Sequence, residues 1–387
     1  MKYYIYTFGC KVNRYETQLI ADKLKSDGYL PADAPEDADI IVFNSCTVTE
    51  NADKECLSFL RKVSKFEHNP KIILTGCMSK RPIADLSDKI EIVADKKTLY
   101  KNADTQSIET FDNRSRAFLK IQDGCDSFCS YCIVPFARNE LWSKPAKTVL
   151  AEIETLVKTG YSEIVLTGIH VGKYSGGLSN LLEKIVKIPL VFRARISSIE
   201  INEVDDKLIA LMKENPDKIC AHLHIPLQSG SDDILKLMNR KYLAKNYADK
   251  VVKILKEFPN LALTADIITG FPGETEQHHK ETCDFLKSLA FSRLHIFRYS
   301  DRPGTKASEF ANKVPPEILK QRSEELFEID KQKRKEFLKK NFGKKRKAVM
   351  IGKNKALSDN YIESGVLKLE QRVKGIIEIT INEHCKI

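Results

Sequence analysis

Apolar and polar positions alternate along the first third of the chain in a pattern that predicts strands and helices in turn. Four short apolar runs are YYIYTF (3–8), DIIVFN (39–44), KIILTG (71–76) and EIVA (91–94). Helix-like stretches near Tyr15–Leu24 and Ala52–Val63 separate the first three runs. This alternation is typical of a parallel sheet covered by helices. We therefore predict an α/β fold that begins with a doubly wound parallel sheet.

A second alternation of strands and helices occupies the middle of the chain. Its apolar runs are AFLKI (117–121), EIVLTGI (163–169), FRARISS (192–198), AHLHIPL (221–227), LTADIITG (263–270) and RLHIFRY (293–299). Periodic helical stretches, such as 150–160 and 208–215, lie between them. Six such units predict a partly closed (β/α)6 barrel, whose functional residues gather at the carboxyl ends of its strands.

The polar segment Lys101–Arg116 reads as a linker between these two parts, because it has little apolar content. A long charged helix is expected over Pro315–Asn341, followed by short β-like runs at 346–352, 361–369 and 375–381. These runs predict a small C-terminal β module. The expected domains are therefore 1–112, 113–340 and 341–387, which suits a chain of 387 residues.

The net charge of +10 is concentrated in one segment, Lys331–Lys347, which holds ten Lys or Arg and one Glu. A basic block of this kind attracts a polyanion such as nucleic acid. A solvated helix face would look the same in sequence, so both interpretations stay open. We expect neither a signal peptide nor a membrane span, because the first residues do not resemble a signal peptide and no apolar run is long enough to span a membrane. The ten cysteines are a small fraction of a long chain, which favours a reducing, cytoplasmic location.

Three cysteines, Cys125, Cys129 and Cys132, follow the first barrel strand in the stretch GCDSFCSYC. A structural zinc site takes four protein ligands and disulfides take cysteines in pairs, so three thiols fit neither. Three thiolates can instead hold three irons of a 4Fe-4S cluster and leave the fourth iron open to a substrate. The alternatives are an incomplete zinc site or a chance grouping.

A second set of three cysteines is dispersed along the chain, since Cys10, Cys46 and Cys77 each come at the end of an apolar strand. The carboxyl ends of neighbouring parallel strands lie at one edge of a sheet, so these thiols are expected to meet. Three thiols again predict a cluster with an open iron. The alternative is three buried structural cysteines.

The CxxxCxxC spacing resembles that of the radical S-adenosylmethionine (SAM) superfamily, and the whole chain resembles its methylthiotransferase family. The resemblance extends to TFGCKVNRYET, FNSCTVTENAD, LTGIHVGKY, HLHIPLQSGSDDILKLMNRKY and DIITGFPGET. It implies two 4Fe-4S clusters, SAM bound to the open iron of the barrel cluster, and an auxiliary cluster in the N-terminal domain. Within the family, GCKVN resembles the branch that modifies N6-threonylcarbamoyladenosine beside the anticodon of tRNA.

The resemblance also assigns further residues. Gly168, Glu200 and Gln228 are implied to contact SAM, although a turn glycine and surface polar residues would look alike in sequence. No acid or base is expected beyond the cluster ligands. The C-terminal segment resembles a TRAM RNA-binding module through DNYIESGV. Asn139 and Trp142 depart from the family pattern, and Trp142 is open to a role in packing or in base stacking.

The expected reaction is conversion of the tRNA nucleoside to its 2-methylthio derivative, with an external electron donor and sulfur source. The same reaction on isopentenyladenosine or on a ribosomal protein aspartate is an alternative. A noncatalytic iron-sulfur RNA-binding protein is another.

Overall fold

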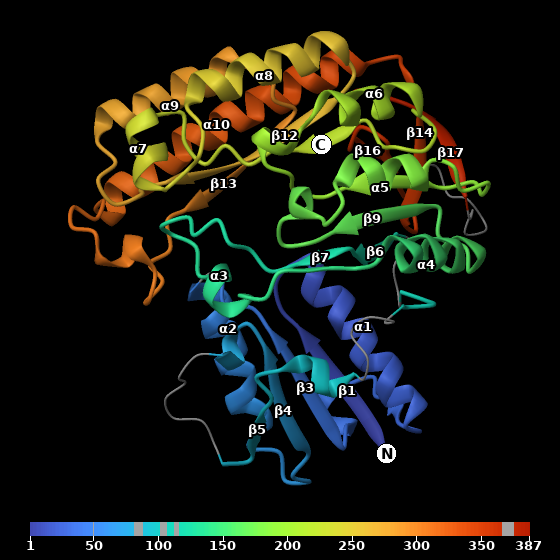
Figure 1. The fold of residues 1–387 in the computed structure, drawn as a ribbon. Helices are drawn as coiled ribbons and strands as arrows, with labels where there is room; N and C mark the ends of the chain where they lie inside the picture. The colour runs from blue at the N-terminus through green and yellow to red at the C-terminus, as the bar shows by residue number, and fades with distance from the viewer. Residues whose placement is uncertain (49, 81–87, 101–106, 112–115, 366–374) are drawn as a thin grey trace.

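The computed structural model describes residues 1–387 except 49, 81–87, 101–106, 112–115 and 366–374. Figure 1 shows an N-terminal sheet, a larger body of strands and helices above it, and a small set of C-terminal strands at the side of that body. This arrangement confirms the predicted α/β class with added C-terminal strands.

The N-terminal part is a five-stranded parallel sheet in the order β2-β1-β3-β4-β5. Its strands are β1 (Lys2–Thr7), β2 (Leu30–Pro31), β3 (Ile40–Ser45), β4 (Lys71–Gly76) and β5 (Ile90–Ile92), and its helices are α1 (Lys11–Ser26) and α2 (Glu50–Val63). Successive side chains of a strand point to opposite faces. Phe43 accordingly packs in the cluster that contains Leu60 of α2, whereas Val42 joins Tyr15 of α1 in the cluster shared with the barrel.

Six parallel strands form the barrel, as predicted. They are β6 (Ala117–Lys120), β9 (Glu163–Thr167), β10 (Arg193–Ile196), β11 (His222–His224), β12 (Ala262–Thr269) and β13 (Arg293–Arg298). Bridges from Ala194 to Ile219 and from Ser198 to His224 join the two three-stranded halves into one sequence of neighbours. In the described part of the chain no pairing closes β6 onto β13, and α1 packs against β6 at this opening.

Helices cover the outside of the barrel (Figure 1). They are α4 (Ala146–Lys158), α5 (Leu178–Ile185), α6 (Asp206–Glu214), α7 (Asp232–Leu237), α8 (Ala244–Glu257) and α9 (Glu276–Ser288). The predicted charged helix is α10 (Pro316–Asn341), which packs against β13. Between β6 and α4 the chain forms β7 (Gln122–Asp123), α3 (Val134–Ala137) and β8 (Trp142–Ser143), with β7 and β8 paired antiparallel.

The C-terminal strands form an antiparallel sheet in the order β16-β15-β14-β17. They are β14 (Lys345–Gly352), β15 (Lys355–Ser358), β16 (Glu363–Gly365) and β17 (Ile376–Thr380). β15 is a strand that the apolar pattern did not predict. Of the expected run 361–369, the part from 366 onward lies outside the described residues.

The C-terminal sheet is joined to the barrel by buried polar contacts. Arg195 of β10 pairs with the buried Glu163 and donates to the carbonyl oxygens of Ser358 and Asp359 at 2.9 and 3.0 Å. Tyr361 stacks on His222 with ring centroids 4.5 Å apart. The sheet is therefore packed on the barrel, with its turns reaching the barrel's interior side chains.

The expected linker is only partly described, because 101–106 and 112–115 lie outside the described residues. Within 107–111, Ile108 and Phe111 are buried in the main hydrophobic cluster. The amide of Ile108 donates to the Glu152 carboxylate at 3.0 Å. This stretch of the expected linker is therefore packed into the hydrophobic core.

Candidate functional site

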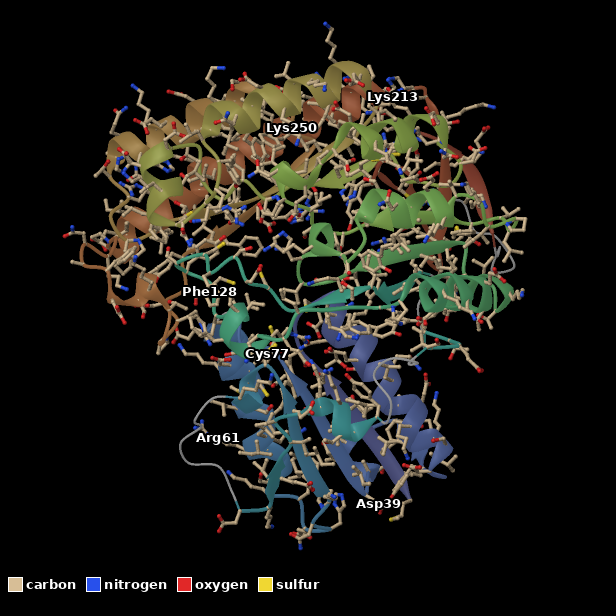
Figure 2. All side chains as sticks on the ribbon, in the orientation of Figure 1. Asp39, Arg61, Cys77, Phe128, Lys213 and Lys250 are labelled. Atoms are coloured by element: carbon tan, nitrogen blue, oxygen red, sulfur yellow. The ribbon has the colours of Figure 1, made fainter. Side chains whose placement is uncertain are left out.

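The loop that carries Cys125, Cys129 and Cys132 follows β7 at the carboxyl end of the first barrel strand. All three thiols are half-buried and line an open cavity of about 220 Å³ at the mouth of the barrel. Figure 2 shows Phe128 of this loop at the junction between the barrel and the N-terminal sheet, with Cys77 nearby. The loop therefore presents its sulfur atoms to a space that lies at the strand ends.

Polar groups surround two of these sulfur atoms. The amide of Ser127 donates to Cys125 Sγ at 3.5 Å, and His170 Nδ1 lies 3.6 Å from the same sulfur. Arg240 Nη1 donates to Cys129 Sγ at 3.4 Å. Burial alone would raise the pKa of Cys125, but the hydrogen bonds from His170 and Ser127 lower it. Thiolates bind iron, so this environment suits a cluster ligand set.

Two of the residues predicted to contact SAM line the same cavity. Glu200 pairs with Arg240, and Gln228 and Asp266 also line the cavity. The Gln228 side-chain oxygen is buried and has no hydrogen-bond partner among the described residues. An unpaired buried acceptor is costly, so it fits a ligand that brings a donor into the cavity.

Gly168, the third predicted residue, packs under the cysteine loop. A Cβ atom at Gly168 would lie 3.0 Å from the side chain and carbonyl oxygen of Gln122. Gln122 in turn donates to the carbonyl of Gly124 at 2.8 Å and accepts from the amide of His170 at 2.7 Å. The glycine therefore allows Gln122 to connect the loop with the end of β9.

His170 and Arg240 are site residues that the sequence pattern missed. His170 contacts both Cys125 and Glu203, the latter at 2.6 Å. Burial alone would lower the pKa of His170, but hydrogen bonds to Cys125 and Glu203 raise it to about 9. The position of His170 in the sequence could have indicated its role, because it comes two residues after Gly168 at a strand end.

Cys10, Cys46 and Cys77 follow three adjacent strands of the N-terminal sheet. The register pairs Thr7 of β1 with Asn44 of β3, and Ser45 of β3 with Gly76 of β4. All three cysteines thus come just beyond neighbouring strand ends, where Cys46 interacts electrostatically with Cys77 and Cys10.

Local packing keeps these strand ends close together. A Cβ atom at Gly9 would lie 2.6 Å from Cys46 Sγ, and Gly9 has a positive φ of 90° that favours glycine. Burial raises the pKa of Cys46 to about 11, whereas Cys10 is exposed. A second three-thiol edge is therefore present, with one member accessible to solvent.

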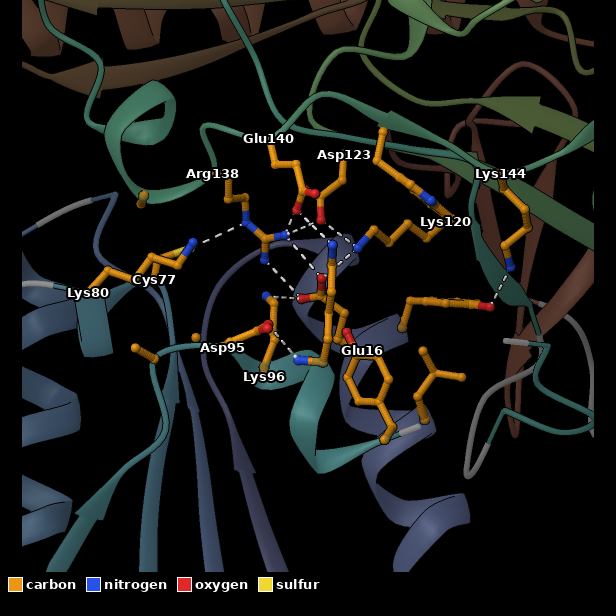
Figure 3. A pocket seen from close by; sticks show the side chains of 18 residues that line it. Glu16, Cys77, Lys80, Asp95, Lys96, Lys120, Asp123, Arg138, Glu140 and Lys144 are labelled. Carbon is orange, nitrogen blue, oxygen red and sulfur yellow. Dashed lines mark hydrogen bonds and ion pairs between the residues drawn. The ribbon is translucent and has the colours of Figure 1, made fainter. Parts of the chain in front are cut away.

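One arginine connects the two cysteine sites (Figure 3). Arg138 Nε donates to Cys77 Sγ at 3.4 Å, while its backbone carbonyl accepts from the amide of Cys125 at 3.3 Å. Its guanidinium also pairs with Glu16 of α1 and Asp123 of β7. Burial alone would raise the pKa of Glu16, but Arg138, Lys120 and Lys96 hold it well below its usual range. The network fixes the N-terminal sheet against the barrel mouth.

Two sequence features that suggested RNA binding, Trp142 and the basic block Lys331–Lys347, contact other parts of the protein. The Lys120 ammonium lies 5.4 Å from the centre of the Trp142 ring, so this tryptophan packs at the domain junction. In the basic block, Arg334, Arg346 and Lys347 form ion pairs with Asp330, Asp359 and Asp217 respectively. These pairs favour the interpretation of the block as a solvated, locally neutralised surface.

Another group of ligand-type side chains lies on the outer helices. His279 and Cys283 of α9 approach Glu325 of α10, with all three ligand-type atoms within 4.8 Å of one another. His279 Nε2 lies 2.9 Å from Glu325 and 3.4 Å from Cys283 Sγ. Mutual hydrogen bonding accounts for this arrangement.

Comparison with known proteins gives two family matches. Residues 2–96 match the uncharacterized protein family UPF0004, and residues 119–286 match the radical SAM superfamily. A threonylcarbamoyladenosine tRNA methylthiotransferase MtaB of Thermotoga maritima is 36% identical, covering 94% of this chain and 88% of that protein. The chain belongs to the radical SAM methylthiotransferase family.

Other members of the methylthiotransferase family are similarly related. The MtaB protein of Bacillus subtilis is 37% identical over 86% of this chain and 81% of its own length. A tRNA-2-methylthio-N(6)-dimethylallyladenosine synthase of Acetivibrio thermocellus is 32% identical over 84% of this chain and 75% of its own. Radical SAM membership implies SAM and a 4Fe-4S cluster, which the three thiols at the barrel mouth are chemically suited to hold.

A solved structure supports the fold. The radical SAM methyltransferase TsrM of Kitasatospora setae superposes with a TM-score of 0.55 at 13% identity, over 76% of this chain and 73% of that one. In the described part of the methylthiotransferase chain, no helix is both long and apolar enough to cross a membrane.

Proposed function

We propose that this chain converts N6-threonylcarbamoyladenosine, next to the anticodon of tRNA, to 2-methylthio-N6-threonylcarbamoyladenosine. Relatives whose names state this substrate are 36% and 37% identical to it over most of its length. The relative named for dimethylallyladenosine is 32% identical. The GCKVN sequence around Cys10 supports the same choice of substrate.

We assign two 4Fe-4S clusters to the chain. Cys125, Cys129 and Cys132 are proposed to hold the cluster that binds SAM, and Cys10, Cys46 and Cys77 the auxiliary one. The single observation that carries the second assignment is the convergence of its three cysteines beyond the adjacent strands β1, β3 and β4. The corresponding domains are proposed to be 1–112, 113–340 and 341–387.

Adenine carbon 2 bears an unactivated C–H bond, so no side-chain base removes its proton at a useful rate. When bound, the barrel cluster and SAM would supply a deoxyadenosyl radical able to abstract that hydrogen. The side chains of the protein would orient SAM and the cysteine loop. Glu200 and Gln228 offer acceptors to SAM in the cavity, Arg240 holds Glu200, and Gly168 seats the loop that carries Cys125.

The partner is tRNA, and the methylthio sulfur and the electrons come from an external source and donor. Phe128 and Phe136 offer aromatic surface near the cysteine loop, since each is 54% exposed and their rings meet edge to face at 5.9 Å. Exposed aromatic rings stack on unpaired bases. An anticodon loop entering from this side would meet them.

Anaerobic reconstitution followed by nucleoside mass spectrometry tests the proposal. The wild-type protein should carry about eight irons per chain and add a methylthio group to threonylcarbamoylated tRNA. Replacing Cys10, Cys46 and Cys77 together by Ala should leave about four irons and abolish methylthiolation, while SAM cleavage continues. Replacing Cys56 by Ala is the matched control. A methylthio product on isopentenylated tRNA alone would contradict the substrate assignment.

A further inference from the structure

Phe128 combines a strained backbone with an exposed side chain. Its φ is 45°, in the left-handed region that a bulky residue rarely adopts and that glycine adopts freely. Its ring is 54% exposed and, among the described residues, joins none of the buried hydrophobic clusters. Neither the backbone nor the packing of this loop therefore favours a phenylalanine here. Strain of this kind persists at binding sites where neighbouring groups hold it in place.

Asn239, in the turn after α7, supplies a group that holds this conformation. Its side-chain NH2 donates to the carbonyl of Phe128 at 2.9 Å and to that of Ser127 at 3.5 Å. Its side-chain oxygen accepts from Lys241 Nζ at 2.6 Å, which directs the NH2 group toward the loop. Asn239 itself has a φ of 59°, in a region where asparagine is enriched. The amide therefore has a fixed direction and binds the strained carbonyl.

The same turn fastens the loop on the other side of Cys129. The amide of Ser130 donates to the carbonyl of Met238 at 3.1 Å, and the Ser130 hydroxyl donates to the carbonyl of Leu237 at 2.7 Å. Carbonyls at the C-terminal end of a helix lack an intrahelical donor, so they are available for such contacts. The loop is therefore held both before and after Cys129.

We propose that Asn239 is a positioning residue, which holds Phe128 so that its ring stacks on an unpaired base of the anticodon loop. This inference rests on the proposed function, because it concerns how that RNA is bound. The neighbours of Phe128 in the chain, Ser127 and Cys129, line the cavity at the barrel mouth. A base stacked on the ring would therefore lie beside the reacting nucleoside. Phe136 supports the ring edge to face, with centroids 5.9 Å apart.

The chemistry of the ring selects single-stranded RNA as the partner. Exposed aromatic side chains stack on bases that are not paired, and every base offers a face for this contact. Bases in a duplex are already stacked on one another, so they offer no free face to Phe128. The ring should therefore contribute to the binding of a stem-loop and not to that of a duplex.

Fluorescence anisotropy of an anticodon stem-loop RNA on the anaerobically reconstituted protein tests this inference. Phe128→Gly removes the ring and relieves the backbone, so the affinity should fall about tenfold while the iron content stays equal to wild type. Phe128→Tyr should bind as wild type because it keeps an aromatic ring, whereas Phe128→Leu should resemble Phe128→Gly. A duplex RNA of the same length should bind equally to wild type and Phe128→Gly. Phe327→Ala, which truncates a 50% exposed phenylalanine of α10, is the matched control.

A double variant tests whether Asn239 acts through Phe128. Asn239→Gly tolerates the positive φ but removes the amide, so the affinity for the stem-loop should fall about fivefold, as expected for one hydrogen bond. In the Phe128→Gly background, the same change should cause no further loss, because the ring that it positions is already absent. A purely structural role of Asn239 would instead add its own loss in the double variant.

The outcomes separate this inference from the proposed function. Unchanged affinity in Phe128→Gly, loss of its iron, or wild-type binding by Phe128→Leu overturns the stacking role of Phe128. Losses that add in the double variant overturn the positioning role of Asn239. A wild type whose stem-loop binding depends on Phe128 in this way, but which forms no methylthio product, overturns the proposed function alone.

Discussion

Arg138 donates a hydrogen bond to the sulfur of Cys77 at 3.4 Å, across the junction between the barrel and the N-terminal sheet. Because its backbone carbonyl also accepts from the amide of Cys125, one residue spans both cysteine sites. Its charge is balanced by Glu16 and Asp123, which come from different sides of the junction. The relative position of the two sites therefore depends in part on a buried ionic network, beside the hydrophobic cluster that the N-terminal sheet shares with the barrel.

Replacing Arg138 by Met should strongly destabilise this junction. The change leaves the buried carboxylates of Glu16 and Asp123 with less positive charge, and breaking a buried pair in this way costs about 3–5 kcal/mol. Urea unfolding followed by circular dichroism measures the loss. Adding Glu16→Gln should recover part of the stability, because it removes the uncompensated charge. Lys97→Met, which breaks a surface pair with Glu140, should cost at most about 1 kcal/mol. Equal losses in the two single variants would contradict the role of the network.

A methyl group added at Gly168 should disturb the SAM site through Gln122, which packs against this glycine. The added Cβ would lie 3.0 Å from Gln122, which holds both the Gly124 carbonyl and the His170 amide. Overpacking of this kind costs about 1–3 kcal/mol, and here it would displace the loop before Cys125. Gly168→Ala should therefore lower the yield of deoxyadenosine from SAM more than it lowers the melting temperature. Gly365→Ala serves as control, since no atom of the described residues lies within 4 Å of the added one.

Much of the fold was predictable because strand and helix periods are local properties. The six barrel strands and helix α10 were located from apolar spacing, and the strand ends correctly brought Cys10, Cys46 and Cys77 to one edge. Parallel topology makes this step possible, because it places the carboxyl ends of consecutive strands side by side.

Contacts between distant segments were not predictable from one sequence. Nothing in the local pattern around Arg138 indicates that it meets both Glu16 and Cys77, which lie far away in the chain. His170 and Arg240 were missed for the same reason, since their partners Cys125 and Cys129 are reached only after folding. The sequence alone left two interpretations of the basic block open, because the acidic residues that pair with it, such as Asp217 and Asp359, are brought against it only by folding.

We expect the folded protein to lose stability as the pH is lowered, because histidines in the barrel interior resist protonation. Burial and the nearby His224 lower the pKa of His295 to about 4, whereas an unfolded histidine titrates near its ordinary value of about 6.5. The unfolded chain therefore binds a proton between these values that the folded chain does not. The stabilising contribution is fully present above about pH 6.5 and is lost progressively as the pH falls toward about 4.

Urea unfolding between pH 7 and pH 5 measures this effect. His295→Gln should reduce the pH slope of the unfolding free energy by at most about 1.4 kcal/mol per pH unit, the value for one proton. The reduction should be smaller than this limit because the ring is partly exposed. His384→Gln, at an exposed position near the C-terminus, should leave the slope unchanged. An identical slope in His295→Gln and wild type would show that this ring titrates normally in the folded protein.

The C-terminal sheet should act as a structural part of the barrel. Arg195 is buried between Glu163 and the carbonyl oxygens of Ser358 and Asp359 at the end of β15, so Arg195→Met leaves acceptors on both sides without their donor. The expected loss of unfolding free energy is about 3–5 kcal/mol. Lys345→Met removes an exposed pair with Glu378 on the same sheet and should cost at most about 1 kcal/mol. If the sheet were an independent RNA-binding module, Arg195→Met would weaken tRNA binding while leaving the unfolding of the barrel unchanged. Denaturation and tRNA affinity measured on both variants distinguish these roles, because a structural sheet loses stability first and a binding module loses affinity alone.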